Sequence, residues 1–207
     1  MSLAHYLAFV AATAVLLVVP GPTILLVVSY ALGKGMRAAL PMAVGVALGD
    51  FTAMTLSLIG LGAVLAASST LFMALRWAGA AYLVWMGWKL WKAGGAMQVE
   101  AREDDASPGK MVAHAWLVTA LNPKSIIFFV AFVPQFMDPA ANWWTQMLIM
   151  EATFLTLAFA NALAYAALAS RARAMTRDPR AVSLFNRAGG AALMGLGGYA
   201  AASAARA

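Results

Sequence analysis

Two ionisable side chains lie in the middle of otherwise apolar stretches of the chain. Asp50 follows Gly49 in one stretch, and Lys124 lies in another. A charged group at the centre of a bilayer costs about 2.5–3.5 kcal/mol on insertion scales, so each is expected to have a partner. Their mutual attraction would keep the core neutral, and one acidic and one basic group together complement an amino-acid zwitterion. The alternative is a buried pair that only fixes the register of two helices.

Proline interrupts two of the apolar stretches at corresponding positions. The interruptions are Val19-Pro20-Gly21-Pro22-Thr23 and Leu121-Asn122-Pro123-Lys124-Ser125. Proline has no N–H and its ring clashes with the preceding turn, so backbone carbonyls are freed at membrane depth. Such a backbone is tolerated only where protein buries it or where it lines a wet cavity, and matched interruptions indicate a transporter binding site. The alternative is an ordinary pair of proline kinks that neighbouring side chains repair.

The composition shows which class of protein carries these features. The chain has 207 residues, of which 63% are hydrophobic and 11% charged, and its mean hydropathy is +0.80. This is a membrane-protein composition rather than a globular one. The net charge of +6 does not indicate nucleic-acid binding, because the basic residues are divided among three short loops. With no cysteine and two distant histidines, His5 and His114, no metal site, cofactor or enzyme active site is expected.

The apolar stretches predict an all-α integral membrane protein with six transmembrane helices, since about 20 apolar residues are needed for each crossing. The expected spans are 3–32, 38–66, 71–90, 112–136, 144–169 and 182–204. A polar cytoplasmic linker at 96–111 separates a first three-helix half, 1–95, from a second, 112–207. Because three spans is an odd number, the halves would form two inverted repeats, each with its first helix broken by proline.

The distribution of Lys and Arg predicts the orientation. Basic residues occupy the first-to-second, third-to-fourth and fifth-to-sixth connections, and they are missing from the other two. The positive-inside rule therefore places those three loops in the cytoplasm and both termini outside. No Lys or Arg precedes Lys34, so the first apolar stretch is expected to be a retained membrane helix rather than a signal peptide.

Other polar and small residues are secondary candidates. Glu151 lies about two turns into the fifth span, where interfacial water could reach it, and Asn161 is deeper in the same span. An asparagine at this depth more commonly hydrogen-bonds to a neighbouring helix than binds a ligand, so Asn161 is expected to connect helices. Five glycines crowd the last span: Gly189, Gly190, Gly195, Gly197 and Gly198. They predict close helix packing, and this span is the candidate contact for a homo-oligomer.

These features favour a secondary transporter that exports amino acids or close derivatives, with protons and the lipid bilayer as its other partners. Asp50 is the preferred proton carrier: burial and a nearby cation act oppositely on the proton affinity of a carboxyl group, so a substrate separating the charges would change it. An ion or small-solute channel also uses broken helices and buried carbonyls. A non-transporting membrane scaffold is the remaining alternative, but it leaves the paired breaks and midplane charges without a purpose.

The chain resembles the LysE/RhtB family of amino-acid exporters along essentially its whole length. The resemblance rests on Pro20-Gly21-Pro22, Gly49-Asp50, Asn122-Pro123-Lys124, Pro134-Gln135-Phe136, the third-span residues Gly79, Tyr82, Gly87, Trp88 and Lys89, and Asn186-Arg187 followed by Gly189. It implies a bacterial inner-membrane transporter that exports amino acids such as lysine, homoserine, threonine or leucine using the proton motive force. Carried over by position, the family's marked residues are Pro20, Gly21, Pro22, Asp50, Asn122, Pro123 and Lys124.

Overall fold

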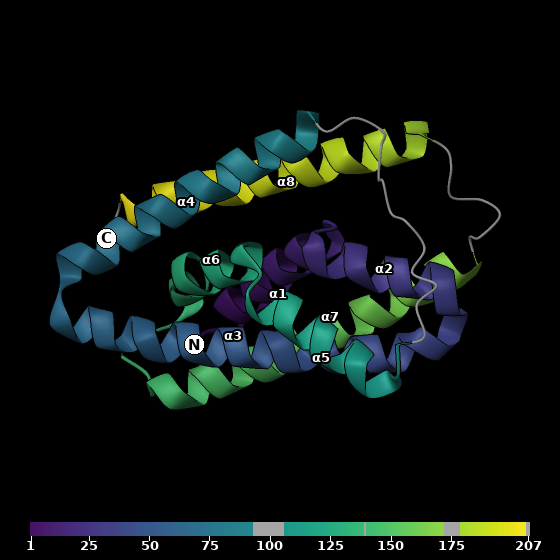
Figure 1. Ribbon diagram of the computed structural model, residues 1–207. Helices are drawn as coiled ribbons and strands as arrows, with labels where there is room; N and C mark the ends of the chain where they lie inside the picture. The colour runs from purple at the N-terminus through teal and green to yellow at the C-terminus, as the bar shows by residue number, and fades with distance from the viewer. Residues whose placement is uncertain (93–105, 139, 172–178, 206–207) are drawn as a thin grey trace.

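The computed structural model describes residues 1–92, 106–138, 140–171 and 179–205, and every regular element within these ranges is helical (Figure 1). Most of the predicted polar linker therefore lies outside the described residues, as does the fifth-to-sixth connection at 172–178. The elements are α1 (Leu3–Val18), α2 (Pro22–Lys34), the 3-10 helix η1 (Gly35–Ala38), α3 (Ala39–Ala67), α4 (Ser69–Lys92), α5 (Pro108–Ala120), α6 (Pro123–Ala131), the 3-10 helix η2 (Val133–Phe136), α7 (Trp143–Arg171) and α8 (Pro179–Ala204).

Both proline interruptions are real breaks between helices. The chain leaves helical geometry between α1 and α2 and again between α5 and α6, with a bend of 47° between α5 and the segment formed by α6 and η2. Pro22 and Pro123 each begin a helix, the position where a missing N–H costs nothing because no intrahelical acceptor exists there. The end of the expected fourth span differs from the prediction. Residues Val133–Phe136, which include Pro134, form the 3-10 helix η2 instead of continuing the α-helix.

Two segments of the described chain are long and apolar enough to cross a membrane. These are Pro22–Val64 and Trp143–Arg171, and the bent pair of α5 with α6–η2 adds a third if it is one span. The helices α4 and α8 coincide with the expected third and sixth spans but do not meet the same condition. Both helices contain an arginine and several residues of low hydropathy: Arg76 lies within α4, and Arg187 and five glycines lie in α8.

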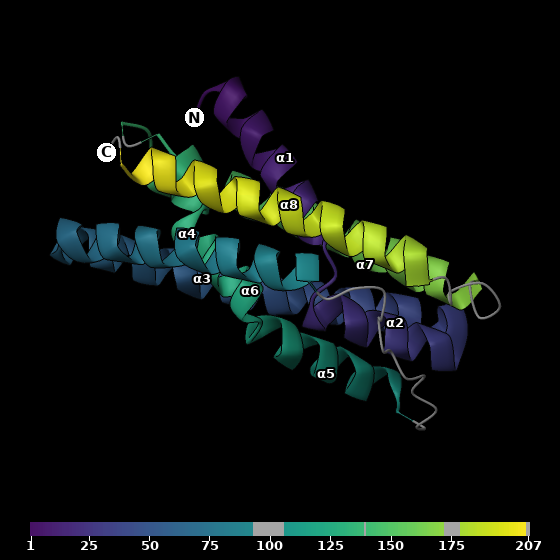
Figure 2. The same ribbon diagram turned by 90° about the horizontal axis from the view of Figure 1, so that it is seen from above.

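The helices α4 and α8 pack closely along each other and form a layer beside the remaining helices (Figures 1 and 2). Glycine permits this approach: a Cβ atom on Gly87 would lie 2.6 Å from the Gly190 carbonyl oxygen, and one on Gly197 would lie 2.8 Å from that of Ala80. Gly190 and Gly197 of the glycine-rich last span are therefore used for a contact within the chain. A Cβ atom on Gly195 or Gly198 would meet nothing within 4 Å.

A core of aromatic side chains holds α6 in place. Phe128 and Phe129 of α6 are fully buried, and both pack on Phe154 of α7 with ring centroids 6.1 and 4.8 Å apart. Phe132 stacks on Phe128 at 5.2 Å. Because a large buried aromatic side chain contributes substantial packing energy, this cluster packs the middle and end of α6 against α7, about one turn after Lys124.

Candidate functional site

The two helix breaks meet, and Lys124 joins them. Its side chain is 7% exposed, and its ammonium group donates hydrogen bonds to the carbonyl oxygens of Leu16, at 2.8 Å, and Val19, at 2.6 Å. These carbonyls lie at the C-terminal end of α1, where the helix leaves its last C=O groups without intrahelical partners. A residue of the second break therefore satisfies backbone groups freed by the first.

The two carbonyls between them are satisfied by α7. Asn161 Nδ2 donates to the Leu17 oxygen at 3.0 Å, and the Tyr165 hydroxyl donates to the Val18 oxygen at 2.6 Å. Three side chains thus serve the four consecutive carbonyls of residues 16–19, which we call the α1 carbonyl site. Asn161 was expected to connect helices, and this is the contact that it makes. Tyr165 was not expected; its signal was its place one helical turn after Asn161, on the same face of α7.

Hydroxyl and amide groups connect the starts of the two later half-helices. Asn122 caps α6 by accepting a hydrogen bond from the Lys124 N–H at 3.0 Å, and its Nδ2 donates to Thr23 Oγ1 at 3.1 Å. Thr119 also donates to Thr23 Oγ1, at 3.2 Å. All of these side chains are buried. The two threonines were missed in the sequence because nothing distinguishes them from the other hydroxyls of apolar helices, which commonly bond within their own helix.

Replacing Asn122 by Ala is expected to destabilise the protein by about 2 kcal/mol, about 1 for the lost helix cap and about 1 for the lost bond to Thr23. The matched control is Asn142→Ala, which removes the exposed cap of α7, where Asn142 accepts from the Thr145 N–H at 3.0 Å. It should cost about 1 kcal/mol. Thermal unfolding of the purified variants measures both changes, and equal midpoints would show that the bond to Thr23 contributes nothing.

Asp50 lies beside the same breaks but is not in contact with Lys124. It is 2% exposed, the Ser125 side chain lies next to its carboxylate, and the charges of Asp50 and Lys124 attract each other. Across the described chain, however, the one ion pair within 4.0 Å joins the N-terminal amine to Asp138. Asp50 Oδ1 has no hydrogen-bond partner among the described residues. The expected attraction is present, but Lys124 contacts the α1 carbonyl site instead of the carboxylate.

The remaining predicted residues of the breaks shape the backbone. Pro20 and Gly21 are half-buried in the first break, while Pro22 and Pro123 are exposed helix starts. A Cβ atom on Gly21 would lie 3.5 Å from both the Nζ and Cε atoms of Lys124, so this glycine leaves the ammonium group free of a neighbouring side chain.

Gly49 faces a neighbouring helix. A Cβ atom there would lie 2.5 Å from Thr119 Cβ and 2.7 Å from the Trp116 carbonyl oxygen. This places Gly49 in the contact between α3 and α5, directly beside Asp50 in sequence.

Glu151 is separate from the two breaks. It is 4% exposed, and its Oε1 accepts a hydrogen bond from Thr55 of α3 at 2.5 Å. Thr55 follows Asp50 by five residues, a rise of about 7.5 Å along α3. The expected access to interfacial water is closed off by this packing, so the structure gives Glu151 a contact between helices rather than a solvated position.

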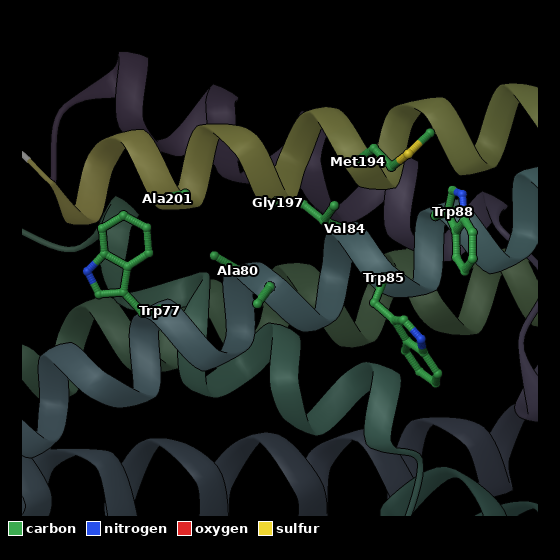
Figure 3. Close-up of a pocket in the computed structure, with 9 residues that line it drawn as sticks. Trp77, Ala80, Val84, Trp85, Trp88, Met194, Gly197 and Ala201 are labelled. Carbon is green, nitrogen blue, oxygen red and sulfur yellow. The ribbon is translucent and has the colours of Figure 1, made fainter.

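A surface groove between α4 and α8 has a different character. It is lined by three indole rings of α4, those of Trp77, Trp85 and Trp88, and by small or apolar residues of both helices, including Met194 and Gly197 (Figure 3). Its lining contains no ionisable residue. Among the described residues, no group of three or more His, Asp or Glu side chains could hold a metal ion. Of the buried charged residues, Asp50 and Lys124 lie at the two breaks and Glu151 lies apart from them.

Broken helices around buried charges define the class of protein, because irregular backbone at membrane depth that carries ligand-binding groups is typical of transporters. The family model described as LysE type translocator matches residues 14–204. The chain belongs to this family, and it is a transporter rather than an enzyme.

Named relatives agree with this assignment. The chain is 31% identical to a homoserine/homoserine lactone efflux protein of Salmonella typhimurium, over 95% of this chain and 96% of the relative. It is 34% identical to a leucine efflux protein of an Enterobacter species, over 70% of this chain and 69% of the relative. An uncharacterized membrane protein of Vibrio cholerae is 32% identical over 95% of this chain and 96% of the relative. No solved structure matches the chain.

Proposed function

We propose that this protein exports amino acids or close derivatives across the bacterial cytoplasmic membrane by proton antiport. The observation that carries the proposal is the bond from Lys124 to the carbonyls of the first break, with a partnerless Asp50 oxygen nearby. These groups offer an acceptor set and a donor for the two ends of a zwitterion. The named relatives support this class of substrate, since their names refer to homoserine, homoserine lactone and leucine.

Two inverted three-helix repeats are the architecture that we infer for the transporter. The halves would be α1–α2 with α3 and α4, and α5–α6 with α7 and α8. A two-fold operation that exchanges them pairs the α3–α5 contact with the α1–α7 contact, the α3–α6 contact with the α2–α7 contact, and α4–α8 with itself. Each of these contacts exists. In Figure 2, α1–α2 and α5–α6 run in opposite directions, as inversion requires.

Both termini are proposed to face outward. They lie toward the same end of the molecule, and the basic residues Lys34, Arg37 and Lys92 end or follow helices at the other end (Figures 1 and 2). The positive-inside rule then places the basic end in the cytoplasm. The two described basic groups of α4, Lys89 and Lys92, lie over the Trp85 and Trp88 rings, at 4.7 and 4.2 Å from the centroids. Such pairs are typical of a membrane interface.

Asp50 is the proposed proton-binding group. Its carboxylate is buried, one oxygen has no partner among the described residues, and the nearest cation is held by carbonyls rather than by the carboxylate. A proton could therefore bind and leave without breaking a salt bridge. Exchange of a proton for substrate would follow if the two occupy this site in alternation.

Efflux from cells preloaded with a mixed amino-acid pool tests the proposal. Cells that express the protein should lower their internal level of one or a few amino acids relative to cells with empty vector, and an uncoupler should stop this loss. The rate should saturate as the internal concentration rises, because a finite number of binding sites carries the substrate. Equal pools in both strains, despite verified membrane insertion, would contradict export, and flux that ignores the uncoupler would contradict proton coupling.

A further inference from the structure

We propose that the Lys124 ammonium group is a built-in substitute for the substrate's own ammonium group. It occupies the α1 carbonyl site while the transporter is empty, and a primary ammonium group of the substrate takes its place during export. Lys124 then turns toward Asp50. The identity of the physiological ligand rests on the proposed export of amino compounds, whereas the site itself rests on the contacts around Lys124.

The α1 carbonyl site is built to hold a cation. The distances of 2.8 and 2.6 Å from Lys124 Nζ to the Leu16 and Val19 oxygens are those of charge-assisted hydrogen bonds. The C-terminal end of a helix carries a partial negative charge, which adds to the attraction. The ammonium group has three N–H donors, and two of them are used here. Any primary ammonium group of similar reach could make the same bonds.

The other two carbonyls of the site are held by neutral groups. Asn161 and Tyr165 donate to the Leu17 and Val18 oxygens from α7. These bonds keep the end of α1 in one position whether or not a cation is present. The site can therefore survive an exchange of one ammonium group for another, which a site formed only by Lys124 could not.

Asp50 offers a second position for the displaced lysine. Its Oδ1 is buried and has no partner among the described residues, and the lysine stem has four rotatable carbon–carbon bonds. Gly21 borders the ammonium group without a side chain, since a Cβ atom there would be in van der Waals contact with Nζ at 3.5 Å. After the exchange, the substrate cation has the carbonyls and Lys124 has the carboxylate. The carboxylate, which has no ion pair within 4.0 Å while Lys124 lies on the carbonyls, gains one in this step, and pairing lowers the cost of a charge in the membrane.

The exchange also predicts which chemical group of the substrate the site recognises. Homoserine, its lactone and leucine share a primary amino group, but the lactone has no free carboxylate. A site that replaces Lys124 selects for the shared group and does not need the carboxylate. A quaternary ammonium group has no N–H and could not take over the two hydrogen bonds to Leu16 and Val19.

The test adds a free amine to the purified Lys124→Ala variant, so that the amine can occupy the space of the missing lysine side chain. Propylammonium replaces the atoms that this truncation removes. It should raise the unfolding midpoint of purified Lys124→Ala by several degrees, because a ligand that binds only the folded state stabilises it. Wild type should respond much less, because its own lysine competes for the carbonyls. The matched control Lys110→Ala, whose lysine is exposed at the start of α5, should respond no more than wild type. Tetramethylammonium at the same ionic strength should leave all three unchanged.

Two results would overturn the proposal: no selective stabilisation of Lys124→Ala by propylammonium, or an equal effect of tetramethylammonium. A second measurement uses wild type, in case the variant does not fold. Leucine amide, which has a primary ammonium group and no carboxylate, should stabilise wild type, and its N-trimethyl analogue should not. Equal effects of the two compounds would also overturn the exchange.

The result is separable from that of the efflux experiment. Selective stabilisation by propylammonium without any amino-acid export would support the ammonium site and contradict the proposed function. Confirmed export without selective stabilisation would leave the exporter in place and show that Lys124 is not a substitute for the substrate.

Discussion

Asp50→Asn is expected to lower export driven by a pH gradient at least tenfold while leaving the protein folded in the membrane. Asparagine has nearly the same shape as aspartate but cannot bind and release a proton. Of the acidic side chains that the structure describes, Asp50 is the one beside both helix breaks. A tenfold lower transport rate corresponds to an activation free energy that is about 1.4 kcal/mol higher. Reconstituted vesicles with an imposed pH gradient measure the rate directly.

Exchange of labelled for unlabelled substrate without a gradient separates coupling from binding. Asp50→Asn should retain more of this exchange than of gradient-driven transport, since exchange needs no net proton movement. The matched control is Asp138→Asn, whose side chain is 44% exposed and lies after η2, away from the breaks. It should transport at the wild-type rate. Wild-type gradient-driven rates in Asp50→Asn would show that the proton binds elsewhere.

The positions of the helix breaks could be predicted from the sequence because the effect of proline is local. Pro22 and Pro123 begin helices wherever they stand, since a missing N–H and a fixed φ act within one turn. The burial of Asp50 and Lys124 was likewise predictable, because apolar residues surround both in sequence.

The partners of these groups could not be predicted in the same way. Which carbonyls Lys124 reaches depends on how α6 packs against α1, and those residues are more than 100 positions apart in the chain. Charge complementarity alone favoured a direct contact with Asp50. The freed carbonyls of the break compete for the same ammonium group, and the structure places them closer. Thr23 was missed for a related reason, because a neutral hydroxyl gives no signal of a distant partner.

Glu151 shows how a depth argument can fail. Counting residues from the outer end of its helix placed it within reach of water, but the count says nothing of which face it occupies. Its face packs on α3, where the Thr55 hydroxyl covers the carboxylate. Depth along a helix and burial within a bundle are independent quantities, and only the hydrophobic periodicity of α7 addresses the second.

The contact between α3 and α5 determines where Asp50 lies relative to the breaks. Gly45 and Gly49 are one helical turn apart, and both face α5: a Cβ atom on Gly45 would lie 2.5 Å from the Val112 carbonyl oxygen. Because α5 ends at the second break, the distance between these helices sets the distance from Asp50 to the start of α6. Small residues at this contact therefore serve the site as well as the fold.

Gly49→Val is expected to destabilise the protein by about 3 kcal/mol or more, at the upper end of the usual cost of overpacking. Its Cβ atom would lie 2.7 Å from the Trp116 carbonyl oxygen, and a backbone atom cannot move aside without moving α5. The matched control is Gly60→Val in the same helix, where a Cβ atom would meet nothing within 4 Å. Both variants place the same β-branched residue in the same helix, so their helix propensities change equally. The difference between their unfolding midpoints therefore measures the contact between α3 and α5. If Gly49→Val unfolds at the midpoint of Gly60→Val, α3 and α5 are not packed as closely as the glycines imply, and Asp50 is not held by this contact.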